Sequence, residues 1–574
     1  MNSETKNCQN CKKDFIIEPD DFSFYKKMNV PSPTFCPECR LQRRLTWRNE
    51  RNLYRRKCDV PGHNEFIIAM YPENTPFPVY DTKYLWSDEW DANDYKMDLD
   101  FSRPFFEQWK ELFNSVPTIS LINLQDVNSD YCNFTYQSKN CYLNFASDVN
   151  EDTAYLYHSI ENRNCYDMLG SRKNENCYEL IDCEECYNSA YLKVSSNCID
   201  SRFCYDCRNC SNCIGCVGLR NAQNCILNVK YSPIEYKSKL EKLNLSTILG
   251  KKDMGKEYGS ILKNYPRKFS NSRHSVKSTG DYINGAKNCT DCFDIEGPAQ
   301  DLRYVIYGVT NMSDTYDCYA IGMNIENSYE CFDSGDSMSN VAFTANAWNS
   351  FSCRYCYFIK NCSNCFGCVG IKNKQYCILN KQYTKEEYED LLLKIIEHMN
   401  DKPYIDKNDI VYKYGEFFPS ELSPFAYNES IVSELFPNTK EEILNHGYRW
   451  KDKEVKNYKI DIRLDDLPIQ IKDIDDLIIG KVIECSHYGK CSENCTLGFK
   501  IIPEELQFYK KMNLPLPHLC PNCRHYERLS QRNPMKLWHR SCMKEGCTNE
   551  FETSYAPDRP EIIYCEKCYQ QEVY

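Results

Sequence analysis

Cysteine recurs with a period of three along the middle of the chain. Every cysteine from 132 to 225 stands at a position divisible by three, and Asn often precedes it, as at Asn164, Asn197 and Asn209. Asn tolerates the left-handed backbone of tight corners, and Cys is a small apolar residue that suits a narrow interior. The pattern predicts a parallel β-solenoid over residues 126–400, although its spacings match none of the common repeat periods.

The predicted solenoid consists of two duplicated halves. The segment NCSNCIGCVGLRNAQNCILN at 209–228 recurs 152 residues later as NCSNCFGCVGIKNKQYCILN at 361–380. The second half keeps the three-residue phase of its cysteines only in patches, as insertions between repeat units would produce. The handedness of the coil does not follow from this pattern.

A helix signal follows each copy of the duplicated segment. Each signal opens with Ser or Thr and carries Glu three residues later, which is the capping box that satisfies free backbone N–H groups. Helices are therefore expected at about 233–244 and 385–399. A third is expected at 104–114, where PFFEQWKELFN has helical apolar spacing.

The two ends of the chain are also copies of one another. Residues 11–84 align with 495–568 at a constant offset of 484 without a gap. Both copies contain the hexapeptide FYKKMN, the motif Cys-Pro-x-Cys-Arg, and several arginines beyond it. The two ends are therefore expected to share one local fold.

Two cysteine pairs at the N-terminus have the spacing of a metal site. Cys8 and Cys11 form one CxxC knuckle, and Cys36 and Cys39 form a second after 24 intervening residues. Two such turns can bring four thiolates into a tetrahedron. The segment CQNCKKDFIIEPDDFSFYKKMNVPSPTFCPECR resembles the zinc-ribbon domain of many bacterial proteins, which implies structural zinc and no activity.

The C-terminal copy departs from this pattern in its first knuckle. Cys491 and Cys495 have the wider spacing CxxxC, and Cys485 lies nearby as a competing thiol. The second knuckle keeps the CxxC spacing. The ligands expected here are Cys491, Cys495, Cys520 and Cys523.

A further ribbon is predicted at the extreme C-terminus, where RPEIIYCEKCY looks like part of a small ribbon. Its expected ligands are Cys542, Cys547, Cys565 and Cys568. The offset of 484 places these four on Cys58, His63, Asp81 and Tyr84. A Cys, His and Asp trio could hold zinc with water in the fourth position, but a decayed structural site is the better interpretation.

Composition limits the environment of the protein. The chain has 574 residues, 37 cysteines and a net charge of -12, and it has neither an N-terminal secretory signal nor a membrane-length apolar run. A soluble, cytoplasmic protein that contacts no membrane is expected. In a reducing cytosol, the central cysteines are expected first to pack as buried thiols, then to bind metal, and last to form disulfides.

Each of the two duplicated ribbons is followed by a basic segment with aromatic residues. Eight Arg or Lys stand against two Glu between Cys36 and Cys58. The candidate nucleic-acid contacts are Arg40, Arg44, Arg48, Arg56, Arg524, Arg528, Arg532 and Arg540. They could neutralise phosphates, or they could pair with carboxylates of the solenoid; the acidic net charge slightly favours the second role.

The expected fold is mostly β, with terminal zinc ribbons flanking an internally duplicated, cysteine-rich β-solenoid and a few short helices. The expected domains are a zinc ribbon with its basic segment (1–60), a degenerate ribbon with a connector helix (61–125), two solenoid halves (126–250 and 279–400) joined by a linker (251–278), an acidic connector (401–480), the ribbon copy (481–541) and a second C-terminal ribbon (542–574).

No catalytic motif or small-molecule site is recognisable, so the sequence favours a zinc-binding structural or interaction protein that contacts RNA or another protein. The alternatives are a carbohydrate-active solenoid enzyme, which needs clustered carboxylates on one face, and a thiolate metal-cluster protein for storage or redox. The whole chain resembles a family of uncharacterised cysteine-rich proteins with terminal zinc ribbons from reduced-genome bacteria. That resemblance implies no function.

Overall fold

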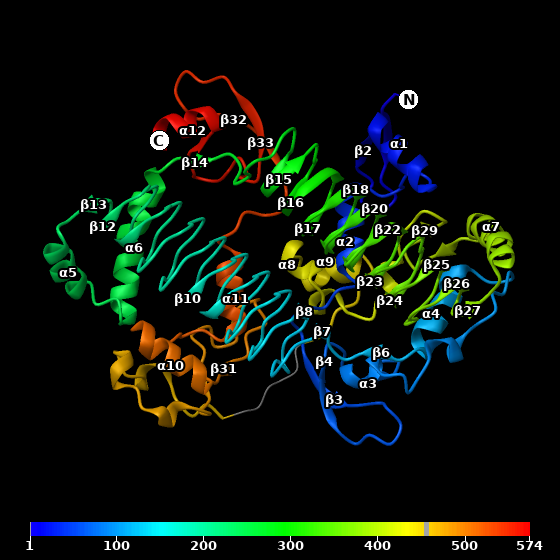
Figure 1. Ribbon diagram of the computed structural model, residues 1–574, viewed down its shortest axis with the longest axis horizontal. Helices are drawn as coiled ribbons and strands as arrows, with labels where there is room; N and C mark the ends of the chain where they lie inside the picture. Colours follow the sequence, from blue (N-terminus) through cyan, green and yellow to red (C-terminus); the bar gives the residue numbers. More distant parts are fainter. Residues whose placement is uncertain (1, 453–458, 574) are drawn as a thin grey trace.

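The structure is a computed structural model that describes residues 2–452 and 459–573. Its middle is a coil of short parallel strands, seen edge-on in Figure 1. Between Val127 and Arg220, parallel bridges join residues 12 apart, for example Lys139 with Glu151 and Glu151 with Arg163. The first half of the coil is therefore built from stacked turns of 12 residues.

The period of three in the cysteines results from how each turn is built. Asn164 and Asp167 have the left-handed backbone conformation, with φ of 48° and 58°, and such a residue recurs at every third position. The residue after each corner points inward, so that Cys165 and Met168 are completely buried. The predicted left-handed corners at Asn are confirmed.

Asn side chains also stack from turn to turn. Asn128 donates a hydrogen bond to Asn140 at 3.1 Å, and Asn140 donates in turn to Asp152 at 2.9 Å. The same contact joins Asn209 to Asn221 at 3.2 Å. Polar ladders at the corners therefore accompany the apolar interior.

Changing the corner residue Asn209 to Val is expected to lower the free energy of unfolding by about 1–2 kcal/mol. Asn209 has a φ of 53°, and a β-branched side chain clashes with the backbone in that conformation. Equilibrium denaturation measures the loss. Asn209→Gly is the control, because glycine adopts a positive φ without strain; equal losses in both variants would contradict the corner role.

The second half of the coil has longer turns over part of its length. Strands β18 (Met312–Tyr316), β20 (Ile325–Tyr329) and β22 (Met338–Ala342) pair in parallel with an offset of 13 residues. They belong to a curled ten-stranded sheet, and the offset returns to 12 where Ala345 pairs with Tyr357. One extra residue per turn explains why the cysteine phase breaks in this half.

The three predicted helices are present as α4 (Phe105–Ser115), α5 (Pro233–Lys242) and α7 (Lys385–Asp401). Both expected capping boxes form at the starts of α5 and α7. Among the described residues, no helix combines the length and the apolar character needed to span a bilayer.

Helix α6 (Ile248–Asn264), which the sequence analysis did not predict, occupies the first half of the expected linker at 251–278. Thr247 caps this helix by accepting a hydrogen bond from the Gly250 N–H, and Met254 packs it against Ile214 of the coil. The expected connector at 401–480 contains residues 453–458, which lie outside the described residues.

The two ends of the chain dock crosswise on the coil. The N-terminal module, with β1 (Glu4–Asn7), β2 (Asp14–Ile17), α1 (Pro19–Met28) and α2 (Pro37–Leu45), lies against the second half of the coil (Figure 1). Its copy lies against the first half and comprises β30 (Ile483–Glu484), β31 (Gly498–Phe499), α10 (Pro503–Met512) and α11 (Pro521–Leu529).

The repeated FYKKMN segment supplies equivalent aromatic contacts in both places. The ring of Phe24 stacks on Tyr316 with centroids 3.8 Å apart, and Phe508 packs on Tyr166 at 4.4 Å. The two ends therefore share the FYKKMN segment because each copy docks on the coil.

Candidate metal centres and the arginine rows behind them

The four N-terminal cysteines form a site with tetrahedral dimensions. The sulfur atoms of Cys8, Cys11, Cys36 and Cys39 all lie within 4.8 Å of one another, with Cys11 and Cys36 3.7 Å apart. A tetrahedral ion with metal–sulfur distances of 2.3 Å requires edges of about 3.8 Å. This cluster, called site 1, could therefore hold a metal ion.

Site 1 is built into the start of helix α2. Cys36 caps the helix and donates its backbone N–H to the Cys8 sulfur at 3.2 Å, while Cys39 lies in the first turn. Hydrogen bonds from Cys36 and Cys39 hold the pKa of Cys8 far below its ordinary value. Hydrogen bonds with the neighbouring thiols raise the pKa of Cys36 and Cys39 in turn, so the arrangement stabilises a thiolate at Cys8 alone when no cation is bound. The thiolate is the form that binds metal.

The C-terminal copy, called site 2, corrects one predicted ligand. The cluster consists of Cys485, Cys495, Cys520 and Cys523. The Cys485 N–H donates to the Leu497 carbonyl as the Cys8 N–H does to Lys13, and the Cys520 N–H donates to the Cys485 sulfur at 3.3 Å.

Cys485 is therefore the structural equivalent of Cys8, and the prediction that gave this place to Cys491 is wrong. The first knuckle of site 2 spans ten positions, from 485 to 495, whereas that of site 1 spans three, from 8 to 11. The gapless alignment begins after this insertion, which is why the sequence alone did not match the two residues.

The last module also forms a cluster, called site 3. Cys542, Cys547, Cys565 and Cys568 lie within 4.8 Å of one another, as predicted, with the Cys547 and Cys565 sulfurs 3.9 Å apart. The module consists of β32 (Trp538–Ser541), β33 (Glu550–Thr553), β34 (Ile563–Tyr564) and α12 (Glu566–Val573).

In the equivalent hairpin of the N-terminal end, the residues at the ligand positions pack against each other instead of forming a metal site. Cys58 still accepts a hydrogen bond from the Asp81 N–H at 3.4 Å, as Cys542 does from the Cys565 N–H at 3.3 Å. His63 and Tyr84 instead form an edge-to-face ring pair with centroids 5.3 Å apart. Asp81 caps the short helix α3 (Thr82–Trp86), so the trio makes no metal group among the described residues.

The thiols inside the coil are used for packing. Cys204 donates to the carbonyl oxygens of Arg202 at 3.5 Å and Cys213 at 3.4 Å, and the same two-way contact recurs at Cys207 and Cys198. The cysteines of the described coil form no disulfide, and no three of them form a metal-ligating group there. This geometry supports the packing interpretation over a cluster or disulfides.

The arginines behind site 1 form a buried row on the coil. Arg40 pairs with Asp317 at 2.8 Å, Arg43 with Glu330 at 2.8 Å, and Arg48 with Asp333 at 2.7 Å. Arg44 lies 3.5 Å from both Asp317 and Glu330, and its side chain is completely buried. The carboxylates belong to corner residues of the second half, and their side chains point away from the interior of the coil.

The row behind site 2 repeats this arrangement on the first half. Arg528 pairs with Asp167 at 2.7 Å, and Arg524 contacts the same carboxylate. Arg532 pairs with Asp182 at 3.0 Å and with Asp294. The two rows are equivalent, so each copy of the duplicated ends docks on one copy of the duplicated coil.

The last two candidate arginines are also used within the molecule. Arg56 donates to the carbonyl of Pro72 at 2.7 Å and to the Thr75 hydroxyl at 2.8 Å, and Arg540 donates to the Ala556 carbonyl at 3.1 Å. Hence the prediction of a nucleic-acid surface at the eight arginines is wrong, because seven are buried and all eight bond within the chain. The alternative of internal pairing is confirmed for the six in the rows.

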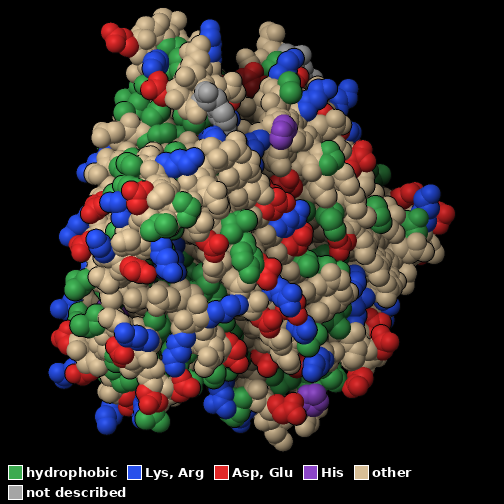
Figure 2. All heavy atoms as spheres, turned by 60° about the vertical axis from the view of Figure 1, so that its left-hand side comes forward, with side chains coloured by type: hydrophobic (Ala, Val, Ile, Leu, Met, Phe, Trp, Pro, Cys, Tyr) green, Lys and Arg blue, Asp and Glu red, His purple; other side chains and the backbone are tan. Residues whose placement is uncertain are grey.

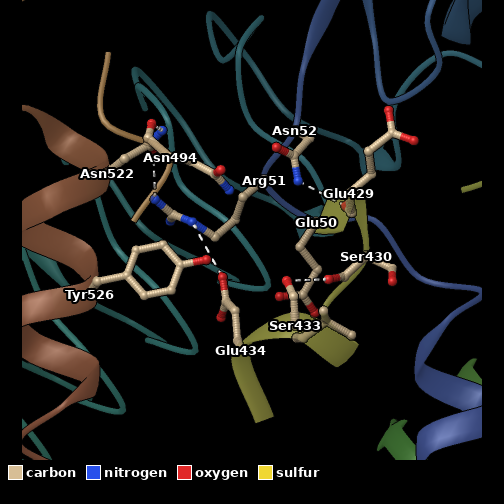
Figure 3. A pocket seen from close by; sticks show the side chains of 11 residues that line it. Glu50, Arg51, Asn52, Glu429, Ser430, Ser433, Glu434, Asn494, Asn522 and Tyr526 are labelled. Atoms are coloured by element: carbon tan, nitrogen blue, oxygen red, sulfur yellow. Dashed lines mark hydrogen bonds and ion pairs between the residues drawn. The ribbon is translucent and has the colours of Figure 1, made fainter. Parts of the chain in front are cut away.

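A small polar pocket lies where the two ends meet (Figure 3). Arg51 lies between Glu434, at 3.8 Å, and the Asn522 amide oxygen, at 3.4 Å, and Tyr526 of α11 faces it. The cavity has a volume of about 20 Å³, roughly that of one water molecule. It is lined by residues of both ends of the chain and of the segment around Glu434.

Sequence reasoning missed the buried histidine beside this junction. His158 stacks on Tyr307 with ring centroids 3.5 Å apart. Burial lowers the pKa of His158 well below its usual 6.5, and the nearby Arg48 and Arg532 lower it further. The histidine is therefore neutral in the folded protein.

His158 is expected to make the protein less stable as the pH falls below about 6.5. The unfolded chain then binds a proton that the folded chain excludes, which costs up to about 1.4 kcal/mol for each pH unit. His158→Phe keeps the ring contact and removes the titration, so denaturation at pH 7 and pH 5 should show a smaller acid loss in this variant. Parallel pH profiles would contradict the assignment.

Comparison with known proteins adds no family. No family model matches the sequence, and no curated protein matches it. Among solved structures, the chain aligns with a candidate acetyltransferase from Desulfovibrio desulfuricans G20 at 10% identity, with a TM-score of 0.09. The alignment covers 44% of this chain and 61% of that chain, less than two thirds of its length, and carries no argument. The class of protein therefore follows from the sites: it is a cysteine-rich protein whose terminal clusters are compatible with metal binding.

Proposed function

We propose that this chain is a zinc-binding structural protein in which terminal ribbons hold together a cysteine-lined β-solenoid. Closed four-thiolate sites suit Zn²⁺, and they leave no position for a substrate. Their role is therefore to fold and fix the ends of the chain rather than to catalyse a reaction. The cysteines of the described coil, which form no disulfide, fit a reducing compartment such as the cytoplasm.

One observation carries this proposal: the helix that each metal site begins is the helix that docks on the coil. Cys36 and Cys39 define the start of α2, and the same helix carries Arg40, Arg43 and Arg44 into the carboxylates of the second half. Helix α11 does the same for the first half. Zinc at either site would therefore fix a helix whose arginine row joins distant parts of the chain.

The same row argues against the solenoid-enzyme alternative. Such an enzyme needs clustered carboxylates on one face of the coil, and Asp317, Glu330 and Asp333 do lie together there. Each of them is covered by an arginine of the N-terminal module. Carboxylates paired in this way are not available as general acid or nucleophile.

A protein is the partner class that the surface favours over RNA. The candidate arginines are engaged inside the molecule, and on the face shown in Figure 2 basic and acidic side chains are interspersed. An aliphatic groove of about 200 Å³ lies between α6 and the C-terminal copy, with Leu249 and Ile469 exposed at its rim. Exposed aliphatic side chains suit a protein contact better than a phosphate backbone.

Retention on immobilised RNA tests this partner class. The zinc-loaded chain should show no binding that weakens steeply between about 50 and 200 mM salt, because the arginine rows are already paired with carboxylates of the coil. A basic nucleic-acid-binding protein serves as the positive control. Steep salt-dependent retention of the folded chain would contradict the proposal.

A further inference from the structure

The insertion in the first knuckle of site 2 carries three additional metal-binding side chains. His487, Cys491 and Glu493 all lie within the ten-position span from Cys485 to Cys495. Together with Cys523 they form a second group whose ligand atoms lie within 4.8 Å of one another. This group shares only Cys523 with site 2.

The distances in this group match a tetrahedral ion with mixed ligands. The Cys491 and Cys523 sulfurs are 3.7 Å apart, and Nδ1 of His487 lies 3.1 Å from a carboxylate oxygen of Glu493. Metal–sulfur distances of 2.3 Å and metal–nitrogen or metal–oxygen distances near 2.0 Å imply edges of about 3.8 Å and about 3.3 Å. Both observed edges agree with these values.

The polar pair in the group also lacks hydrogen bonds. Nδ1 of His487 and Oε2 of Glu493 are both buried and face each other at 3.1 Å, and neither makes a hydrogen bond within the described chain. Buried polar atoms without a hydrogen-bond partner are rare in folded proteins, because their desolvation is not compensated. A divalent cation between the two atoms would accept an electron pair from each and so compensate both.

The position of Cys523 allows its sulfur to bind two ions. Its sulfur lies 3.5 Å from that of Cys520 and 3.9 Å from that of Cys485, which are edges of site 2, and 3.7 Å from Cys491 on the other side. The sulfur atom is thus a corner of two tetrahedra. A thiolate can bridge two cations because it has more than one lone pair.

Site 1 shows what the same sulfur does where the insertion is absent. Cys39, the equivalent of Cys523, accepts a hydrogen bond from the Asn10 amide at 3.3 Å. Asn494, the equivalent of Asn10, instead uses its backbone carbonyl to accept a hydrogen bond from Asn522 at 2.9 Å. The position next to the bridging sulfur is therefore filled by an amide in one copy and by Cys491 in the other.

We propose that the insertion builds a second metal position, in which His487, Cys491, Glu493 and the bridging Cys523 hold a divalent ion of the zinc class beside site 2. The mixture of nitrogen, sulfur and oxygen ligands suits Zn²⁺. This inference rests on the proposed function, since it takes a first zinc ion to occupy site 2. The protein then binds four ions: one at site 1, two at the site 2 pair and one at site 3.

Metal analysis of the zinc-loaded full chain tests this second position. The wild-type protein should carry four zinc ions, and the double variant His487→Ala, Glu493→Ala should carry three while remaining folded by circular dichroism. The matched control is His539→Ala, Glu550→Ala, which removes an exposed histidine–carboxylate pair of the last module, 3.3 Å apart, and should keep four.

The difference between the proteins decides the proposal. A zinc content that does not fall in the His487, Glu493 variant would overturn the second position, whatever its value. The content that remains in that variant tests the proposed function separately, because fewer than three ions there would mean that a four-cysteine site is empty. In the cobalt-loaded chain, the same double variant should also lose part of the absorption from mixed-ligand coordination.

Discussion

Replacing Asp317 with alanine is expected to destabilise the protein by about 3–5 kcal/mol. This carboxylate is completely buried and lies 2.8 Å from Arg40 and 3.5 Å from Arg44. Its removal would leave the buried Arg40 without a carboxylate partner and Arg44 with Glu330 alone, and an unpaired buried charge is far more costly than a lost contact. Equilibrium unfolding of the zinc-loaded chain measures the loss.

Asp314→Ala is the control for this prediction, since it breaks a pair on the surface of the same docking face. Lys27 and Asp314 lie 2.9 Å apart, and their side chains are 48% and 37% exposed. Exposed pairs of this kind contribute about 0–1 kcal/mol. If the two variants lose the same stability, the buried row does not hold the N-terminal module on the coil.

Replacing Cys542 with serine is expected to remove one zinc ion and to unfold the last module. Structural zinc sites supply apparent binding energies of about 10 kcal/mol or more in small domains, so the hairpin of β32 and β33 should not remain ordered without the metal. Metal analysis and amide hydrogen exchange across residues 542–573 give the two measurements.

Cys58→Ser is a matched control provided by the duplication. Cys58 occupies the equivalent position and accepts the equivalent backbone hydrogen bond, but its neighbours His63 and Tyr84 pack as rings. This variant should keep all of its zinc. A loss of metal in Cys58→Ser would show that the N-terminal hairpin still binds an ion.

Much of the architecture could be predicted because it depends on a short-range repeat in the sequence. The three-residue spacing of cysteines and the Asn before them report directly on corners and inward positions, as Asn164 and Cys165 show. Capping boxes located helices α5 and α7 because the signal lies within four residues. Site 1 keeps the CxxC spacing in both knuckles, and site 3 keeps it in the second knuckle, with a wider first knuckle from Cys542 to Cys547.

The remaining features depend on contacts between distant segments. Cys485 could not be matched to Cys8 because an insertion separates it from the aligned region. The same basic sequence could serve RNA or an internal carboxylate, and only the fold shows that Arg40 meets Asp317, 277 positions away. Helix α6 was missed because its glycines resemble a linker, although Thr247 caps it well.

The crosswise docking has a consequence for folding. The N-terminal module binds the second half of the coil, and the C-terminal copy binds the first half, so both contacts close long loops. Loop closure must precede these contacts, which makes such topologies slow to form. Local metal binding at sites 1 and 2 would organise each docking helix before its distant partner is available.

Amide hydrogen exchange in helices α2 and α11, measured on the full chain with zinc and after its removal by a chelator, tests the central claim most directly. We expect both helices to lose their protection when zinc is removed, while the inner repeats from Cys165 to Cys225 remain protected by their own packing. Protection of α2 and α11 that is unchanged by complete zinc removal would contradict the account.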